Sequence, residues 1–147
     1  KHRMKAAEIR DKTKVELSGE SRALRQELFN LRLQKATSQL EKPIRMRELR
    51  RDIARIETRL AQLERKDALG QVATAFEGVS DFTVGGVAAA LRGLANGDLT
   101  RKGVFKTIGA IFNPNLVRVT TRGLAELVQA KGKHKAVAKV KAAAEKL

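Results

Sequence analysis

The chain has 147 residues, and its 31 Lys and Arg against 16 Asp and Glu give a net charge of +15. It contains no Cys, which excludes disulfides, thiolate nucleophiles and Cys-ligated zinc, and its two His lie in Lys/Arg-rich stretches where neighbouring cations disfavour a metal ion. Because it also lacks a nucleophile motif and metal-spaced carboxylates, we expect a protein that is not an enzyme and needs no cofactor.

Two parts of different composition meet near residue 67. Residues 1–66 contain one Gly, whereas residues 67–147 contain the other ten and four of the five Phe. We place a boundary at about 66–70 and expect two domains, 1–66 and 67–147. No uninterrupted apolar run approaches the roughly 20 residues that cross a bilayer, so no membrane contact is expected. Residues 1–14 lack the apolar segment of a secretory signal, which predicts an intracellular location, cytoplasmic or in an organelle.

The first part predicts two helices joined by a short connection. Asp11 or Thr13 can cap a helix that runs to about Ala36, and Glu16 stands where a capping box with Thr13 needs it. The connection ends at Pro43, which suits the first turn of a second helix. Each helix carries an apolar seam at steps of three, four or seven residues: Leu17, Leu24, Leu28 and Leu31 in the first, and Met46, Leu49, Ile53, Ile56, Leu60 and Leu63 in the second.

Matching seams and a short connection predict an antiparallel, coiled-coil-like hairpin, and so an all-α fold for this part. Two helices bury only a small core, so we expect the hairpin to gain order from a partner. An alternative is that the seam pairs with another protein, which would make the segment a coiled-coil interaction module.

Arginine dominates the charge of the second helix. Residues 43–63 contain six Arg and no Lys, and the interleaved acids Glu48, Asp52 and Glu57 are too few to neutralise them. The guanidinium fork binds phosphate bidentately, and contacts with phosphates release counterions from a nucleic acid. The chain has no Trp or Tyr to stack on bases, so we expect phosphate contacts rather than aromatic stacking. The alternative is a solvated face with i,i+4 ion pairs.

Three blocks of the first part occur in a recognisable order. They are MKAAEIRDKT at 4–13, ELFNLRLQKAT at 27–37, and QLE, Pro43 and RMRELRRDIARI within 39–56. Together they resemble the bacterial large-subunit ribosomal protein twenty-nine family (uL29) over about residues 4–66. The resemblance implies a helical hairpin without catalytic activity that binds large-subunit ribosomal RNA beside the polypeptide exit tunnel. It also implies large-subunit protein twenty-three as a neighbour and nascent-chain factors docking close by.

The resemblance also implies which residues contact RNA, from their positions in the family motifs. These candidates are basic side chains and neutral polar side chains, and the amides among them can hydrogen-bond to base edges or 2′-hydroxyls. The candidates are Asn30, Gln34, Lys35, Thr37, Gln39, Arg45, Arg47, Arg50, Arg51 and Arg55. Three features depart from the family pattern. Ser38 stands where the family usually has Gly, residues 1–3 precede the usual start, and residues 67–147 have no counterpart.

The second part predicts helices at about 68–79, 84–95, 100–112, 114–130 and 134–146. We expect its core to use apolar residues of these segments, namely Phe76, Phe82, Phe105, Ile108, Phe112, Leu116, Val119, Leu124, Leu127 and Val128. The Lys-rich run 131–146 is more typical of a basic RNA-contacting tail than of a folded element. This part is interpreted as a natural extension that adds RNA or protein contacts, or alternatively as a foreign segment joined to the hairpin.

Overall fold

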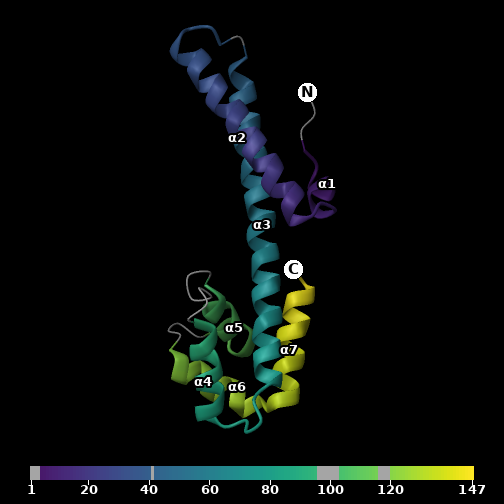
Figure 1. The fold of residues 1–147 in the computed structure, drawn as a ribbon, viewed down its shortest axis with the longest axis vertical. Helices are drawn as coiled ribbons and strands as arrows, with labels where there is room; N and C mark the ends of the chain where they lie inside the picture. The colour runs from purple at the N-terminus through teal and green to yellow at the C-terminus, as the bar shows by residue number, and fades with distance from the viewer. Residues whose placement is uncertain (1–3, 41, 96–102, 116–119) are drawn as a thin grey trace. The chain divides into compact units, whose positions relative to one another are not determined.

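A computed structural model describes residues 4–40, 42–95, 103–115 and 120–147, and these residues form helices and connections without a strand. The all-α prediction is confirmed. In chain order the helices are α1 (Ala6–Arg10), α2 (Lys14–Ala36), α3 (Pro43–Glu77), α4 (Val84–Ala95), α5 (Val104–Phe112), α6 (Thr121–Lys131) and α7 (Lys133–Glu145) (Figure 1). The chain divides into two compact units, Lys1–Leu63 and Glu64–Leu147, and the division falls inside α3.

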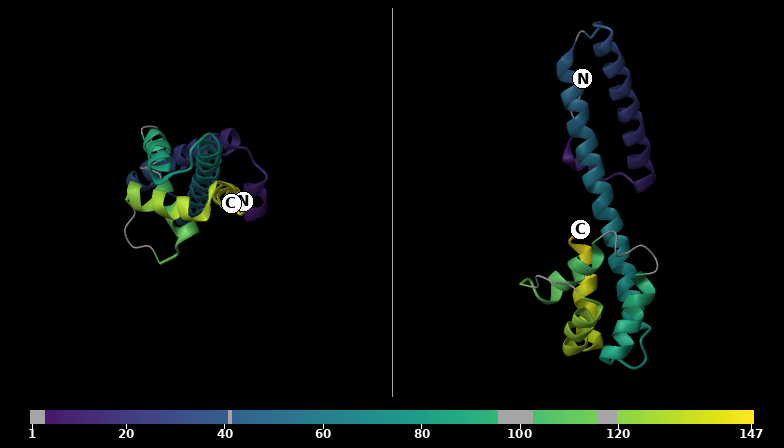
Figure 2. Two further views of the ribbon diagram at one scale, coloured as in Figure 1. Left: turned by 90° about the horizontal axis from the view of Figure 1, so that it is seen from below. Right: turned by 90° about the vertical axis from the view of Figure 1, so that its left-hand side faces the viewer.

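Unit 1 is the predicted antiparallel hairpin of α2 and the first part of α3, which pack against each other and lie side by side in the right-hand view of Figure 2. The predicted capping box starts α2: the backbone N–H of Glu16 donates to Thr13 Oγ1 at 3.3 Å, and that of Thr13 donates to Glu16 Oε2 at 2.8 Å. The hydrogen bond from the Thr13 backbone is the main reason why the pKa of Glu16 is lowered.

The two seams meet as predicted and form two apolar clusters. One joins Leu28 to Met46, Leu49 and Ile53 near the connection between the helices, and the other joins Leu17 to Ile56 further along the hairpin. The second cluster also contains Ile9 of α1, a short helix that the sequence did not predict. The hairpin therefore buries its apolar seam within the chain, and α1 adds one more side chain to it.

The connection between α2 and α3 begins with a Schellman motif. The N–H of Gln39 donates to the carbonyl of Gln34 at 2.8 Å, and that of Ser38 donates to the carbonyl of Lys35 at 3.1 Å. Ser38 has a φ of 59°, the left-handed conformation in which Gly is favoured at this position. Although Ser replaces the usual Gly of the family at this position, the backbone keeps the left-handed conformation that Gly would adopt.

Helix α3 is longer than predicted, because the expected break between a helix ending near residue 63 and another starting at 68 is absent. The run from Leu63 to Leu69 consists of residues that tolerate a helix, and Gly70 alone lowers helix stability by only about 1 kcal/mol. Ala68, Leu69 and Val72 are buried in the core of unit 2, which stabilises this stretch of α3. Packing therefore outweighs the glycine.

Unit 2 packs the end of α3 with α4, α5, α6 and α7 around one core. The predicted Phe76 and Phe82 contact each other edge to face, with ring centroids 6.5 Å apart, and Phe105, Ile108, Phe112, Leu124 and Val128 are buried. Helix α4 has the predicted bounds. Helix α6 starts at Thr121, later than expected, because Thr120 caps it by accepting a hydrogen bond from the N–H of Gly123 at 3.0 Å. The expected core positions 116 and 119, and the helix start at 100, lie outside the described residues.

The interpretation of residues 131–146 as a tail rather than a folded element is wrong. Residues Lys133–Glu145 form α7, whose Ala136, Val137 and Val140 are buried in the unit 2 core. Two of its lysines also hold it to α3 and the loop after α3, since Lys141 Nζ lies 2.6 Å from Glu77 Oε1 and Lys133 Nζ donates to the carbonyl of Val79 at 2.8 Å. The helix predicted at about 134–146 is thus confirmed, and the abundance of lysine concealed only its packing into the core. Within the described ranges no helix is long and apolar enough to span a bilayer.

Candidate nucleic-acid interface

The arginines of α3 in unit 1 fall into two groups. Arg47, Arg50 and Arg51 are exposed, and the structure gives them no ion pair with any residue that it describes. Arg50 and Arg51 lie three and four residues after Arg47, so both are neighbours of Arg47 on the helix surface. We call these three residues the arginine triad. Their guanidinium groups are free to meet an external anion.

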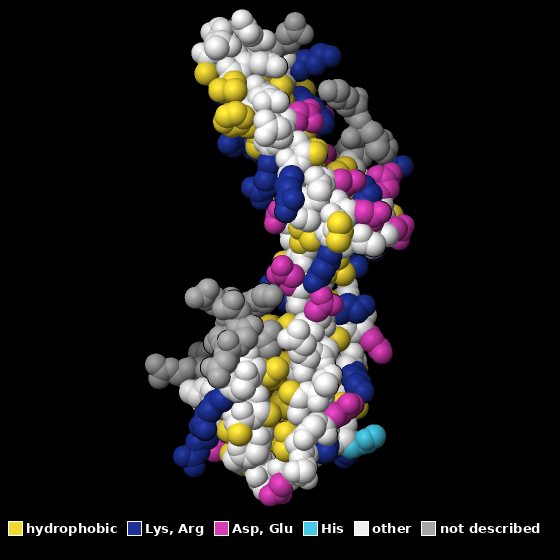
Figure 3. Space-filling view, viewed as in Figure 1, with side chains coloured by type: hydrophobic (Ala, Val, Ile, Leu, Met, Phe, Trp, Pro, Cys, Tyr) yellow, Lys and Arg dark blue, Asp and Glu magenta, His cyan; other side chains and the backbone are white. Residues whose placement is uncertain are grey.

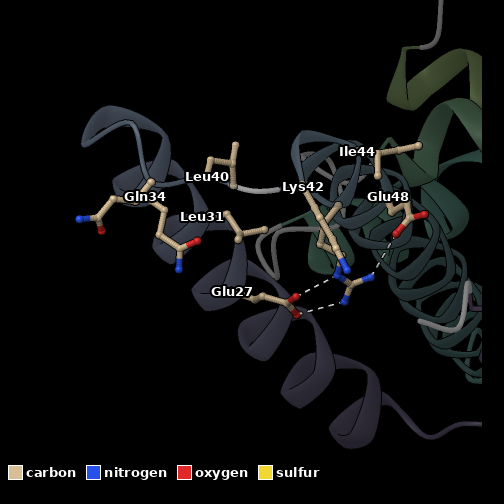
Figure 4. Close-up of a pocket in the computed structure, with 9 residues that line it drawn as sticks. Glu27, Leu31, Gln34, Leu40, Lys42, Ile44 and Glu48 are labelled. Carbon is tan, nitrogen blue, oxygen red and sulfur yellow. Dashed lines mark hydrogen bonds and ion pairs between the residues drawn. The ribbon is translucent and has the colours of Figure 1, made fainter.

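Arg45 instead joins the two helices of the hairpin. Its Nε and Nη2 atoms donate to the two carboxylate oxygens of Glu27 at 2.9 and 3.1 Å, and its Nη1 lies 3.6 Å from Glu48 (Figure 4). The side chain is only 17% exposed. The hydrogen bonds to Glu27, more than any other contact, raise the pKa of Arg45. This bidentate pair fixes α2 against α3 near the connection.

Arg55 is tied to a buried acid. Its Nη1 donates to Asp52 Oδ1 at 2.8 Å, and the Asp52 side chain is 3% exposed. A buried carboxylate requires such a partner, because an unpaired charge is very unfavourable away from water. Six arginines against three interleaved acids still leave residues 43–63 with a net positive charge, but Arg45 and Arg55 are paired within the chain, whereas the arginine triad has no ion pair with a described residue.

A further polar cluster joins the helices and was missed by sequence reasoning. The hydroxyl of Ser21, which is 4% exposed, donates to Glu57 Oε1 at 2.7 Å, and Arg25 Nη2 donates to the same oxygen at 3.1 Å. The hydrogen bond from Ser21, followed by that from Arg25, lowers the pKa of Glu57. The only sequence signal was a serine at the edge of the apolar seam. Arg25 and Glu57 are thus partly used to hold the hairpin.

The neutral candidates and Lys35 gather where the two helices connect. Asn30, Gln34, Lys35, Thr37 and Gln39 are all exposed. The Thr37 hydroxyl donates to the carbonyls of Leu33 and Gln34 at 3.2 and 3.1 Å, so it satisfies the end of α2. Asn30 Oδ1 accepts a hydrogen bond from Gln26 at 3.3 Å, which leaves the amide N–H groups of Asn30 available. The structure therefore brings most of the candidates to one end of the hairpin.

A cleft of about 750 Å³ opens at this end of the hairpin, and we call it the tip cleft (Figure 4). Its lining mixes aliphatic, amide and charged side chains: Glu27, Leu31, Gln34, Gln39, Leu40, Lys42, Ile44, Arg45 and Glu48. All of them belong to unit 1. The cleft shares three residues with the predicted RNA contacts, namely Gln34, Gln39 and Arg45.

Apolar side chains are also exposed on the hairpin. Phe29 and Leu33, one turn apart on α2, are 53% and 52% exposed, and Ile44 is 64% exposed. Figure 3 shows hydrophobic and basic side chains beside each other on this unit. No cluster of His, Cys, Asp or Glu suited to a metal ion occurs among the residues with described positions. The exposed side chains of this unit thus offer cationic, amide and apolar contacts.

Comparison with known proteins decides the family. The profile of the family described as Ribosomal L29 protein matches residues 7–62. Large ribosomal subunit protein uL29 of Caldicellulosiruptor saccharolyticus is 56% identical over 61 residues, which are 42% of this chain and 85% of that protein. The chain belongs to the uL29 family. The uL29 proteins of Alkaliphilus metalliredigens and Moorella thermoacetica are each 54% identical over 63 residues, 43% of this chain and 94% of theirs.

The family match confirms the resemblance that the three sequence blocks predicted. It covers the hairpin, including α1 from Ala7 onward, and ends at residue 62, so all of unit 2 lies outside it. No solved structure matches the chain. The family assignment therefore supports function for the hairpin and leaves unit 2 to be argued from its own structure.

Proposed function

We propose that the chain is a structural constituent of the large ribosomal subunit and that its hairpin binds the RNA of that subunit. The observation that carries this proposal is the arginine triad, exposed and unpaired among the described residues, on the family-matched part of α3. Three adjacent guanidinium groups suit phosphates, and each contact releases counterions from the RNA. The net charge of +15 adds long-range attraction.

The ten predicted RNA contacts divide into two proposed roles. The arginine triad, Lys35 and the amides of Asn30, Gln34 and Gln39 contact RNA directly, because their donors are free to do so. Arg45 and Arg55 act indirectly: their ion pairs with Glu27 and Asp52 hold the shape of the hairpin. Thr37 likewise uses its hydroxyl proton at the end of α2.

We further propose that the hairpin lies beside the polypeptide exit tunnel, next to large-subunit protein twenty-three and near docking nascent-chain factors. The exposed Phe29 and Leu33 support contact with a protein neighbour, because aromatic and aliphatic side chains are favoured in protein interfaces. Because the chain is assigned to the ribosome, we expect to find it in the same cellular compartment as that ribosome.

The alternative of a coiled-coil module for another protein is less well supported. Its seam residues, including Leu28, Met46 and Leu49, are already buried against each other within the chain. A partner helix would therefore have to displace an existing core.

For unit 2 we propose a natural extension that adds contacts with RNA or protein. Its core uses Ala68, Leu69 and Val72 on α3, the same helix that carries the arginine triad, so the family segment and the extension are not separated by a linker. If residues 67–147 instead came from a separate protein, mass spectrometry of purified large subunits would find peptides of the two parts in different species. One species that contains peptides of both residues 1–66 and residues 67–147 is the expected result.

The arginine triad is tested by replacing Arg47, Arg50 and Arg51 with Ala in the full chain. A matched control replaces three other exposed arginines, Arg22, Arg65 and Arg92, and so removes the same charge. Each variant competes with the unmodified chain for incorporation into large subunits, measured by mass spectrometry. We expect the triad variant to be incorporated less than the unmodified chain. In a plot of the logarithm of its RNA-binding constant against the logarithm of the salt concentration, the slope should fall by about 3, roughly one for each lost phosphate contact. Equal incorporation of both variants would contradict the role of the triad.

A further inference from the structure

The tip cleft has a chemistry that differs from the rest of the basic surface. It combines an aliphatic wall with two amides and one lysine, and its volume of about 750 Å³ exceeds what a single phosphate group needs. We infer that the tip cleft receives one unstacked nucleobase of the ribosomal RNA. This inference rests on the proposed function, to which it adds a specific contact between the tip cleft and one base of the RNA.

The aliphatic wall suits the flat face of a base. Leu31, Leu40 and Ile44 line the cleft, and Ile44 is 64% exposed, so this apolar surface is only partly covered by the residues that the structure describes. Covering it with a planar ring removes apolar area from water, which is favourable. No aromatic residue is among those that line the cleft, so the aliphatic side chains are the apolar surface it offers to a base.

The amides can read the edge of the base. Gln34 and Gln39 are exposed and line the same cleft, and the structure assigns their side chains no hydrogen bond within its described ranges. Each amide offers a carbonyl acceptor and two N–H donors, which complement the mixed donors and acceptors on a base edge. Unstacked bases in loops and bulges present such edges, whereas the bases of a duplex are paired.

The charges favour a neutral base inside and a phosphate outside. Glu27 and Glu48 would repel a phosphate within the cleft, and Arg45 pairs with both of them and so neutralises part of that repulsion (Figure 4). Lys42 is exposed and has no ion pair with a described residue. It is available for the phosphate that precedes or follows the inserted nucleotide.

Photo-crosslinking of the full chain assembled in large subunits tests the inference. The photoreactive residue p-benzoylphenylalanine replaces Ile44, whose exposure allows the change, and in a control it replaces Val15, which is 82% exposed and lies outside the cleft. We expect the Ile44 probe to mark one dominant nucleotide in a loop or bulge, mapped by reverse transcription, and the Val15 probe not to mark it. Crosslinks only to a protein, or to many nucleotides of a duplex, would overturn the inference. Absence of the chain from the subunits would instead refute the proposed function.

A second measurement tests the amides. In subunits that contain the chain with Gln34→Ala and Gln39→Ala, chemical probing should show about a tenfold rise in reactivity of the crosslinked nucleotide, as for the loss of one bidentate amide contact. Gln71→Ala with Gln129→Ala removes two exposed amides outside the cleft and should leave that nucleotide protected. Unchanged protection in the Gln34/Gln39 variant would show that the cleft does not read the base.

Discussion

Single residues decide which parts of the hairpin surface are available for binding. Arg45 and Arg50 belong to the same helix and the same residue type, yet one is 17% exposed with a bidentate carboxylate partner and the other is exposed. The difference comes from Glu27, which lies 18 residues before Arg45 and faces it only after the hairpin closes. The spacing of residues along the second helix could therefore predict an arginine-rich surface. It could not predict which of these arginines form ion pairs within the hairpin and which remain available to a partner.

Ser38 offers a test of the turn between the helices. Its φ of 59° is unfavourable for a residue with a Cβ by about 1–2 kcal/mol, whereas Gly avoids this strain at a somewhat smaller entropic disadvantage. We expect Ser38→Gly to raise the free energy of unfolding by about 0.5–1 kcal/mol. The control Ser18→Gly, inside α2, should lower it by about 0.5 kcal/mol. Chemical denaturation measures both, and a destabilised Ser38→Gly chain would contradict the turn geometry.

Glu57 gives a pH-dependent test of the contact between the helices. The hydrogen bond from Ser21 lowers its pKa in the folded chain, so the stabilisation is present above the unfolded pKa of about 4.3 and is lost as pH falls through the folded value. Carbon-13 NMR titration of the carboxyl group should give a pKa below that of an unfolded Glu. In Ser21→Ala the pKa should move back up. A Glu57 pKa that is the same in both chains would show that Ser21 does not control it.

Helices were predictable where the apolar pattern is regular and local signals mark the ends. The seams of α2 and α3, the capping box at Thr13 and the bounds of α4 follow from spacing and from residue preferences alone. The continuity of α3 past residue 66 did not follow, nor did the packing of the predicted helix α7 against other helices, because both depend on burial in the core of unit 2. Six lysines dominate the composition of residues 131–146, four of them inside α7, while Ala136, Val137 and Val140 supply the packing of this helix.

Gly70 tests the continuity of α3. It lies inside the helix, and a Cβ added there would meet no atom within 4 Å. We expect Gly70→Ala to stabilise unit 2 by about 1 kcal/mol, because Ala is the better helix former. Gly103→Ala is the matched control: it also has open space, but its φ of 67° makes the same substitution destabilising by about 1–2 kcal/mol. Calorimetry measures both, and a destabilising Gly70→Ala would contradict a continuous helix.

The whole molecule combines a family hairpin with a second unit that has its own core. The family and the hairpin were predictable because about 60 residues carry both the apolar seams and the characteristic blocks. The packing of unit 2 was less predictable, because its core joins side chains that lie far apart in the sequence, from Ala68 to Val140. Both units belong to a strongly basic chain, so electrostatic attraction to RNA is a property of the whole molecule.

Sedimentation tests the central claim most directly. Cell extract is separated on a gradient at an ionic strength of about 0.15 M, and the chain is followed by quantitative mass spectrometry in each fraction. We predict that the full chain sediments with large subunits in proportion to their other proteins and is released only at high salt, because its phosphate contacts are screened there. Finding the chain free of ribosomes at the lower ionic strength would contradict the account.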